Sequence, residues 1–245
     1  MRSTYDAHDE VLVVTGGANG IGAATARAFA ESGGTAVVLD AVHSAELEGL
    51  ARIEQHLVDV ADRDAVNAAV SDVLERHGQI DGLVAGAVVQ PRCDVVDMDP
   101  DTWRRTLSVN LDGVVWCSQA VLPAMIARRS GSIVVFSSGL AQAGRAQASA
   151  YAASKGALIP YAKSLAAEVA EHGVRVNTIF PGVIDTPQFR AANAFDSERG
   201  HWAATTGIGV SEDVVGPLLF LLSDAATMTG SILTRERAFT MGAAA

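Results

Sequence analysis

The sequence predicts an α/β fold, with a doubly wound, mainly parallel sheet of seven strands and helices on both faces of the sheet. Short and almost continuously apolar runs alternate with helical patterns along the chain. Strands of this kind are typical of a parallel sheet that is buried on both faces. The 245 residues contain no internal repeat and no Pro/Gly-rich linker between independent halves, so we expect one domain over residues 1–245.

The predicted strands are short runs rich in β-branched and other apolar residues, a composition that favours extended backbone. In chain order they cover residues 11–15, 35–40, 53–60, 80–88, 131–138, 174–180 and 231–235. Because helical patterns or long connections separate them, neighbouring strands are expected to be parallel.

The predicted helices carry apolar residues at helical spacing, so that one face of each helix covers the sheet. They cover residues 20–31, a short stretch near 44–50, then 63–77, about 101–109, 113–128, about 150–171 and 211–222. Asp62 and Gly78 are typical residues for the start and the end of the helix between them. Residues 186–209 are polar and lack clear periodicity, so we expect a mobile lid that binds substrate.

The composition excludes several classes of partner. Apolar residues make up 49% of the chain, and the formal charge is −10 with no basic run. Nucleic acid and anionic membrane surfaces are therefore not expected as partners. The two cysteines lack metal-ligand spacing, the polar N-terminus lacks an apolar signal core, and no apolar run approaches the ~20 residues of a membrane span. We therefore expect a cytoplasmic protein.

Residues 15–22, TGGANGIG, join the first predicted strand to the first predicted helix. Glycine permits positive φ and lets the backbone approach a pyrophosphate, and the helix N-terminus that follows offers NH groups and a favourable dipole. This order of strand, turn and helix predicts a Rossmann-type dinucleotide-binding loop. The residues expected to contact the cofactor here are Gly16, Asn19, Gly20, Ile21 and Gly22.

Asp40 ends the second predicted strand, beyond the glycine-rich loop. A carboxylate there can accept hydrogen bonds from the adenosine ribose hydroxyls, and it repels a 2′-phosphate. No Arg or Lys stands at positions 18, 19, 41 or 42 to receive such a phosphate, so the sequence favours NAD over NADP. Asp59 and Val60 end the third predicted strand on the cofactor side. Two interpretations of Asp59 stay open: it reaches the adenine, or it caps nearby backbone NH groups.

Tyr151 and Lys155 are about one helical turn apart, so the phenol and the ammonium lie on one face of the predicted helix. A cation beside a phenol favours the phenolate and lowers the phenol pKa. Ser138 ends the fifth predicted strand, and Asn110 precedes the helix that starts at Gly113. Both can therefore lie at the sheet edge that carries the glycine-rich loop. Singly, each of these residues also has an ordinary structural interpretation.

Together these features resemble the short-chain dehydrogenase/reductase family. Five of them match in order and at family-like spacing: TGGANGIG, Asn110, Ser138, Tyr151-x-x-x-Lys155 and PGVIDT at residues 181–186. They extend over most of the chain, whose length is similar to that of the compact single-domain members. The resemblance implies a nicotinamide cofactor, NAD here, a small-molecule alcohol or ketone as substrate, no metal, and a homotetramer, with a homodimer as the next alternative.

The resemblance also implies a role for each catalytic candidate. Tyr151 is the general acid/base that acts on the substrate oxygen. Lys155 lowers the pKa of Tyr151 and holds the nicotinamide ribose, and Ser138 orients the substrate oxygen. Asn110 helps to position a water that links Lys155 to solvent. The implied reaction interconverts a secondary alcohol and a ketone by hydride transfer.

The stretch at residues 181–186 is implied to hold the nicotinamide end of the cofactor. Its expected contacts are Pro181, Gly182, Ile184 and Thr186, with Thr186 and the backbone near Ile184 on the carboxamide. Such contacts decide which face of the nicotinamide ring is presented to the substrate.

Three places depart from the family pattern. Residues 85–88 read Ala-Gly-Ala-Val where the family usually has Asn-Asn-Ala-Gly, so we expect altered packing on the adenosine side without loss of activity. Residues 236–238 read Glu-Arg-Ala where Asp-Gly-Gly is frequent, which leaves the usual C-terminal turn and tetramer contact open. Residues 189–209 resemble no member closely enough to name a substrate. Within them Arg190, His201 and Trp202 either contact the substrate or are exposed lid residues.

A second class of function stays open from the sequence, a non-catalytic dinucleotide-binding sensor or scaffold on the same fold. The departures at residues 85–88 and 236–238 favour it. The intact set of Asn110, Ser138, Tyr151 and Lys155 favours the enzyme, since a sensor needs no proton relay.

Overall fold

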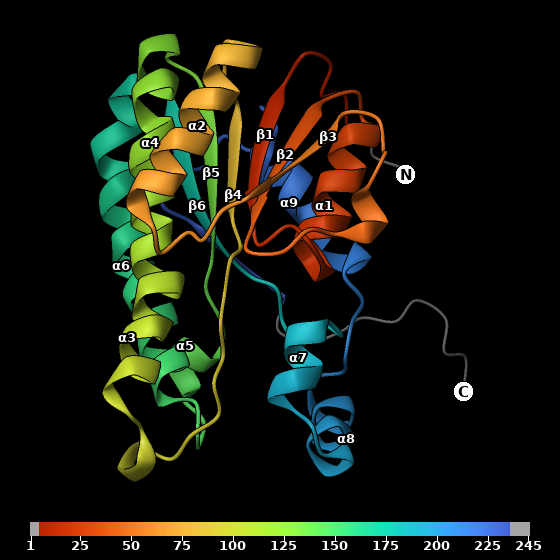
Figure 1. Ribbon diagram of the computed structural model, residues 1–245, viewed down its shortest axis with the longest axis vertical. Coiled ribbons are helices and arrows are strands. Elements are labelled where there is room, and N and C mark those ends of the chain that lie inside the picture. The colour runs from red at the N-terminus through yellow and green to blue at the C-terminus, as the bar shows by residue number, and fades with distance from the viewer. Residues whose placement is uncertain (1–4, 236–245) are drawn as a thin grey trace.

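The computed structural model describes residues 5–235. It contains a seven-stranded parallel sheet with the strand order β3-β2-β1-β4-β5-β6-β7 (Figure 1). The strands are β1 (Val11–Thr15), β2 (Thr35–Asp40), β3 (Ile53–Leu57), β4 (Gly82–Ala85), β5 (Gly131–Phe136), β6 (Val174–Phe180) and β7 (Ile232–Thr234). The chain builds outward from β1 to one edge and then from β4 to the other, which confirms the predicted Rossmann-type fold.

Helices cover both faces of the sheet (Figure 1). Alternate strand residues point to opposite sides: Val13 and Val37 belong to the core cluster with α2, α4 and α6, whereas Leu12 and Val14 belong to the cluster with α1 and α9. The helices are α1 (Gly20–Glu31), α2 (Arg63–His77), α3 (Pro100–Leu107), α4 (Gly113–Arg128), α5 (Leu140–Ala143), α6 (Ser149–Val169), α7 (Pro187–Ala192), α8 (Asp196–Thr205) and α9 (Glu212–Leu222).

The ends of α2 follow from its sequence as predicted. The Asp62 carboxylate accepts hydrogen bonds from the backbone NH groups of Asp64 and Ala65, which have no partner inside the helix. At the other end Gly78 adopts φ 74°, a left-handed conformation that glycine takes without strain.

Several predicted boundaries are wrong, and for β3 the strand pairing gives the reason. The third, fourth and fifth strands end at Leu57, Ala85 and Phe136, before the ends of the predicted strands. Leu57 pairs with Asp40, the last residue of β2, so the apolar run continues past the end of its partner. The helix predicted near residues 44–50 is reduced to a 3₁₀ turn, η1 (Ala45–Leu47).

The segment at residues 186–209, the expected lid, lacks clear periodicity in its sequence but contains α7 and α8. The Thr186 hydroxyl caps α7 by accepting from the Phe189 NH, and Pro187 occupies the first turn. Residues 236–238, where the sequence departs from the family pattern, lie outside the described residues.

A continuous helical stretch, Pro100–Arg128, is long and apolar enough to cross a membrane by length and composition alone. It comprises α3, the π-helical turn η3 (Ser108–Asp112) and α4. The core helix of a globular protein meets the same criterion, and the buried residues of α4 belong to the core cluster on the sheet.

Candidate active site

The glycine-rich loop lies between β1 and α1, at the carboxyl edge of the sheet. Gly16 has φ +67°, and a Cβ atom there would lie 2.6 Å from the Cα atom of Ala87. A Cβ on Gly22 would lie 2.4 Å from the Gly16 carbonyl oxygen. Asn19, the N-cap residue of α1, makes no side-chain hydrogen bond to the first turn. The loop therefore presents bare backbone and a helix N-terminus, which fit the pyrophosphate of a dinucleotide.

Replacing Gly16 by Ala is expected to weaken dinucleotide binding at least tenfold and to lower the free energy of unfolding by about 2 kcal/mol, because the new Cβ meets backbone and φ is positive. Calorimetric binding and urea unfolding measure the two effects. Gly216→Ala in α9 is the control, since a Cβ there meets nothing within 4 Å. Equal behaviour of the two variants would contradict the steric argument.

Asp40 lies beside this loop, and neither Asp40 nor Asp59 belongs to the wall of the pocket described below. The Asp40 carboxylate accepts hydrogen bonds from the NH groups of Ala18 (2.9 Å) and Val42 (3.2 Å), which fixes it against the glycine-rich loop. Asp59 accepts from the Ala61 NH at 3.0 Å and pairs with Arg105 of α3 at 2.8 Å. Partial burial opposes ionisation of Asp59, but the hydrogen bonds from Arg105 and Ala61 hold its pKa below the usual value. Asp59 thus caps the Ala61 NH, as one of its two interpretations predicts.

Val60 is buried against the start of α4, where a Cβ on Gly113 would lie 2.6 Å from its Cγ2 atom. At residues 85–88, which depart from the family pattern, the Thr15 hydroxyl accepts hydrogen bonds from the NH groups of Gly86 (3.1 Å) and Ala87 (3.3 Å). Thr15 therefore satisfies the backbone that leaves β4, and the loop after β4 packs directly against Gly16.

Tyr151 and Lys155 lie in the first turns of α6, close to the end of β5. The Lys155 ammonium donates to the Phe136 carbonyl at 2.8 Å, and the Ser137 hydroxyl donates to the Lys155 carbonyl at 2.8 Å. Burial lowers the pKa of Lys155 to about 7. Burial also raises the pKa of Tyr151, while a hydrogen bond with the Ser138 hydroxyl acts in the opposite sense. The sequence predicts a lowered Tyr151 pKa, but the direction here is the reverse because the desolvation of the phenol dominates.

Asn110 is fully buried in η3, at the junction of α3 and α4. Its side chain accepts from the Val89 NH at 2.8 Å, and it donates to the Val89 carbonyl at 2.9 Å and to the Ser154 hydroxyl at 3.0 Å. The amide therefore ties the loop after β4 to α6, one residue before Lys155. A π-helical turn inside a longer helix is frequent at functional sites.

The stretch after β6 contributes Pro181, Gly182, Ile184 and Thr186 to the wall of the pocket described below. Gly182 has φ +77°, and Ile184 forms an isolated parallel bridge with Gly209. The Asp185 NH donates to the Gly209 carbonyl at 2.8 Å, and the Gly209 NH donates to the Val183 carbonyl at 2.9 Å. The two ends of the segment that carries α7 and α8 are therefore joined to each other at its base.

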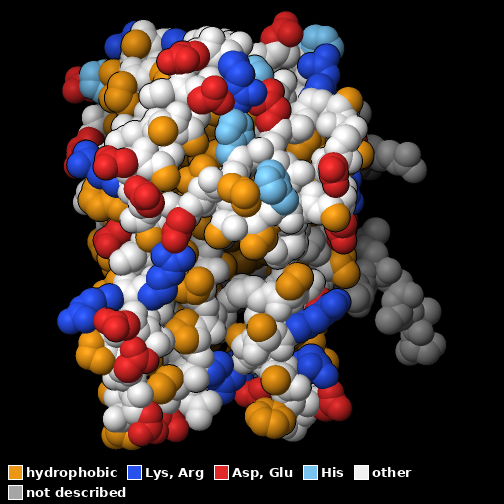
Figure 2. Space-filling view, in the orientation of Figure 1, with side chains coloured by type: hydrophobic (Ala, Val, Ile, Leu, Met, Phe, Trp, Pro, Cys, Tyr) orange, Lys and Arg blue, Asp and Glu red, His pale blue; other side chains and the backbone are white. Residues whose placement is uncertain are grey.

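One pocket brings most of the predicted residues together at the carboxyl ends of the strands. Its wall includes Gly16, Asn19, Gly20, Ile21, Gly22, Ser138, Tyr151, Lys155, Pro181, Gly182, Ile184 and Thr186. Asp40, Asp59, Val60 and Asn110 do not line it. Figure 2 shows this face hollowed below the sheet, with acidic and basic side chains interspersed around it.

The rest of the pocket wall, called its far end below, contains residues that were not predicted as site residues from the sequence, together with Trp202, which was a candidate. The residues of this far end are Val88, Gln90, Leu140, Arg145, Gln188, Phe189, Asn193 and Trp202. The Trp202 indole NH donates to the Asn193 amide oxygen at 3.0 Å. Arg190 instead pairs with Asp185 at 2.7 Å, and His201 is exposed. Trp202 is thus at the pocket, whereas the other two lid candidates are not part of its wall.

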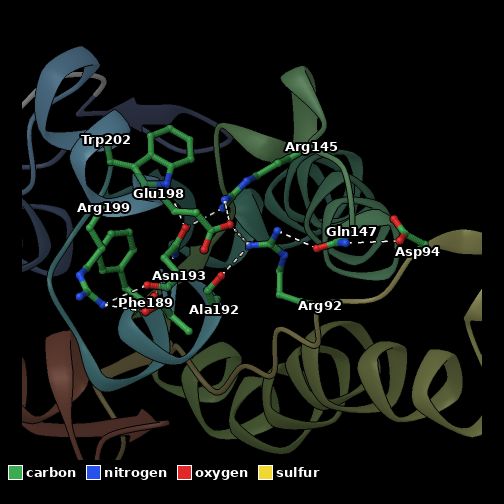
Figure 3. Close-up of polar contacts among 11 residues, drawn as sticks. Arg92, Asp94, Arg145, Gln147, Phe189, Ala192, Asn193, Glu198, Arg199 and Trp202 are labelled. Carbon is green, nitrogen blue, oxygen red and sulfur yellow. Dashed lines mark hydrogen bonds and ion pairs between the residues drawn. The ribbon is translucent and has the colours of Figure 1, made fainter. Parts of the chain in front are cut away.

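A polar cluster fastens α8 to the loops after β4 and α5 (Figure 3). Arg92 and Arg145 each lie 2.9 Å from the same Glu198 carboxylate oxygen. Arg92 also donates to the Ala192 carbonyl at 2.7 Å. Sequence patterns give little signal for this cluster, because both arginines stand in loops without periodicity. The one signal in the sequence is the position of these arginines in loops near the carboxyl ends of the strands, because such loops border the ligand site of a parallel sheet.

Comparisons with known proteins agree with this geometry. The family model described as short chain dehydrogenase matches residues 10–197. The chain is 37% identical to the cis-4-hydroxycyclohexanecarboxylate dehydrogenase of Sinomonas cyclohexanicum over 95% of this chain and 97% of that protein. It is 35% identical to the 3-oxoacyl-(acyl-carrier-protein) reductase FabG of Thermotoga maritima over 91% of this chain and 95% of that protein.

Solved structures of related proteins superpose over nearly the whole chain. The ligand-free aldohexose dehydrogenase of Thermoplasma acidophilum matches with a TM-score of 0.88 at 31% identity, covering 96% of this chain and 95% of that chain. A protein from Beutenbergia cavernae, which contains NADP at low occupancy, matches with a TM-score of 0.88 at 31% identity, covering 96% of this chain and 98% of that one.

Proposed function

The chain belongs to the short-chain dehydrogenase family, and we propose that it is an NAD-dependent oxidoreductase that interconverts a secondary alcohol and a ketone, with Tyr151 as the general acid/base. The observation that carries this proposal is that one pocket contains both the glycine-rich loop and the catalytic candidates. The glycine-rich loop forms one end of it, and Ser138, Tyr151 and Lys155 lie in the same wall. A dinucleotide that enters along the loop therefore ends beside a phenol, a hydroxyl and an ammonium group.

The residues that would hold the cofactor follow from the pocket wall. The backbone from Gly16 to Gly22 and the N-terminus of α1 would bind the pyrophosphate, and Asp40 would bind the adenosine ribose. Lys155 would bind the nicotinamide ribose, and Thr186 and Ile184 the carboxamide. When bound, the nicotinamide supplies the hydride carrier that the side chains of the pocket do not provide.

The proton transfer belongs to Tyr151 and Ser138. Because burial raises its pKa, the Tyr151 phenol holds its proton in the free enzyme, and it can donate that proton to a ketone oxygen. For alcohol oxidation the phenol must first lose the proton. The hydrogen bond with Ser138 and a positive charge on Lys155 favour that loss, since both stabilise the phenolate.

The relatives support this class of substrate. One acts on a ring alcohol that carries a carboxylate, and others are named as galactitol 2-dehydrogenases and as a 3-oxoacyl reductase. Their named substrates share a carbon that is either CH–OH or C=O. We therefore infer that this chain acts on such a carbon.

We also propose that the protein assembles as a homotetramer, with a homodimer as the alternative. Light scattering measures the mass of the assembly and tests this proposal.

A spectrophotometric screen tests the proposed function. The purified protein is mixed with NAD⁺ or NADP⁺ and a panel of ring and chain alcohols, and the appearance of the reduced nicotinamide is followed. Oxidation with NAD⁺ supports the proposal. A clear preference for NADPH with ketones would overturn both the cofactor and the direction, and dinucleotide binding without any turnover would favour the sensor.

Replacing Asp40 by Asn is expected to shift the ratio of kcat/KM for NADP⁺ to that for NAD⁺ upward by about tenfold or more, because it removes a charge that repels the 2′-phosphate. The Asn side chain keeps an oxygen for the Ala18 NH, so the loop geometry is retained. Asp59→Asn is the matched control, since Arg105 already pairs with that carboxylate. A ratio that moves equally in both variants would contradict the role of Asp40.

A further inference from the structure

The far end of the pocket carries positive charge in an otherwise acidic protein. The formal charge of the chain is −10. Yet within residues 5–235 no Asp or Glu side chain lines the pocket, and the charged residues in its wall are Lys155 and Arg145. Lys155 lies beside Tyr151 on α6, whereas Arg145 comes from the loop between α5 and α6 and contacts the lid.

Arg145 is held in one position by three neighbours (Figure 3). It donates to the Asn193 amide oxygen at 2.7 Å and to the Glu198 carboxylate at 2.9 Å, and its Cζ atom lies 5.4 Å from the centre of the Trp202 ring. The two hydrogen bonds use two of the five N–H donors of a guanidinium. Its side chain is one-fifth exposed. The group is therefore fixed in place and still has donors for a ligand.

The charges around Arg145 do not balance. Arg92 and Arg145 share the single carboxylate of Glu198. Arg199 is paired with Asp196 and does not compete for Glu198. Asp94 makes contact with the cluster through Gln147, whose amide donates to Asp94 at 3.3 Å and accepts from Arg92 at 2.9 Å. Burial and the neighbouring Arg92 both lower the pKa of Arg145. One further negative charge at this place would compensate the second guanidinium.

We propose that Arg145 is the residue that selects the substrate by binding its carboxylate, so that the substrate is a hydroxy or oxo acid whose acid group lies away from the reacting carbon. This inference rests on the proposed function and names its substrate class. Arg presents parallel N–H donors that match a carboxylate, and in a partly buried site such pairs are stronger than neutral hydrogen bonds.

The rest of the far end indicates what connects the acid group to the reacting carbon. Val88, Leu140, Phe189 and Trp202 supply apolar and aromatic surface in the same wall as Tyr151 and Arg145. The amides in this wall already have partners, since Gln188 donates to Gln90 at 2.6 Å and Asn193 accepts from Arg145 and Trp202. The apolar surface therefore favours a hydrocarbon ring or chain over a polyol. The substrate class is thus an alicyclic or aliphatic alcohol with a remote carboxylate.

Two pairs of probes test the assignment. Calorimetry compares the binding of cyclohexanecarboxylate with that of the equally shaped cyclohexanecarboxamide. Turnover compares a cyclohexanol that bears a ring carboxylate with its carboxamide. In the wild type the acid is expected to bind about 10- to 100-fold more tightly than the amide, with a Kd lower by that factor, and to have a kcat/KM higher by a similar factor. Arg145→Gln should abolish that preference, so that the acid and the amide become equal to each other, and Arg145→Lys should retain part of it.

Arg92→Gln is the matched control, because Arg92 pairs with the same Glu198 oxygen but does not line the pocket. It should affect acid and amide equally and keep the preference. Equal or undetectable binding of the two probes by the wild type, or a preference that survives in Arg145→Gln, would overturn the assignment. Absence of turnover across the whole alcohol panel, together with a binding preference that depends on Arg145, would instead contradict the proposed function and leave the carboxylate site standing.

Discussion

Replacing Tyr151 by Phe is expected to lower kcat by about 10²–10⁴-fold with little change in cofactor affinity, because it removes the proton donor and acceptor of the reaction and leaves the ring in place. The substrate oxygen would then meet Ser138 alone, and a hydroxyl with the high pKa of serine cannot replace the phenol. Steady-state kinetics in both directions measure the loss, and calorimetric titration with the dinucleotide measures binding.

Tyr161→Phe provides a matched control for this experiment. Tyr161 lies on the same helix, α6, and packs against the core cluster outside the pocket. Its hydroxyl hydrogen-bonds with Ser118, so the control loses a similar interaction without touching the site. We expect it to lose at most about 1 kcal/mol of stability and to keep its activity. Unchanged turnover in Tyr151→Phe would show that the catalytic assignment is wrong.

The fold was largely predictable from the sequence because its signals are local. The apolar runs of β1, β2 and β6 coincide with the observed strands, and the Gly20–Glu31 and Gly113–Arg128 helices have the predicted bounds. The errors concern places where a partner decides the outcome. The third predicted strand reaches Val60, but the observed strand ends at Leu57, which pairs with Asp40, the last residue of β2. Propensity alone does not contain that information.

The lid shows a second limit of sequence reasoning. Residues 196–205 form α8 although no residue of that helix is buried. The sequence therefore contains no apolar stripe from which this helix could be predicted. What positions α8 is a set of contacts to distant loops, such as Arg92 and Arg145 on Glu198. These partners are about 50 to 100 residues away in the chain, and only the assembled sheet edge brings them together.

The candidate site was predictable in its membership and less so in its electrostatics. The spacing of Tyr151 and Lys155 placed both in one pocket, as expected from one helical turn. The direction of the Tyr151 pKa shift was wrong, because burial outweighs the other influences on that phenol. Burial depends on the assembled structure, which no spacing rule describes. The same burial acts on Lys155, and it has a consequence for stability.

Replacing Lys155 by Met is expected to stabilise the cofactor-free protein by roughly 3 kcal/mol at about pH 6, and to abolish activity. Burial lowers the pKa of Lys155 from its ordinary value of 10.5 to about 7. That difference corresponds to roughly 5 kcal/mol against the charged form in the folded state. The variant also loses the hydrogen bond to the Phe136 carbonyl, and this loss reduces the gain in the free energy of unfolding by about 1–2 kcal/mol.

The lowered pKa of Lys155 also determines how the free energy of unfolding changes with pH. Between pH 7 and 10.5 the unfolded chain keeps a proton on Lys155 that the folded protein has released, so the unfolded state binds more protons. Stability of the wild type therefore rises with pH across this window through this group, and the full cost is present below it. Methionine has no charge, so the advantage of Lys155→Met is largest near or below pH 7 and shrinks as the pH approaches 10.5.

Urea unfolding of both proteins at several pH values from about 6 to about 9 measures the difference in the free energy of unfolding. Lys163→Met on the same helix is the control, because Lys163 is exposed and its replacement should change stability by less than about 0.5 kcal/mol at every pH. An advantage of Lys155→Met that does not change with pH would contradict the desolvation argument, and so would a destabilised variant at low pH. If the predicted pattern is found, the ammonium group is retained at a cost in stability, and that is expected of a residue kept for its chemistry and not for its packing.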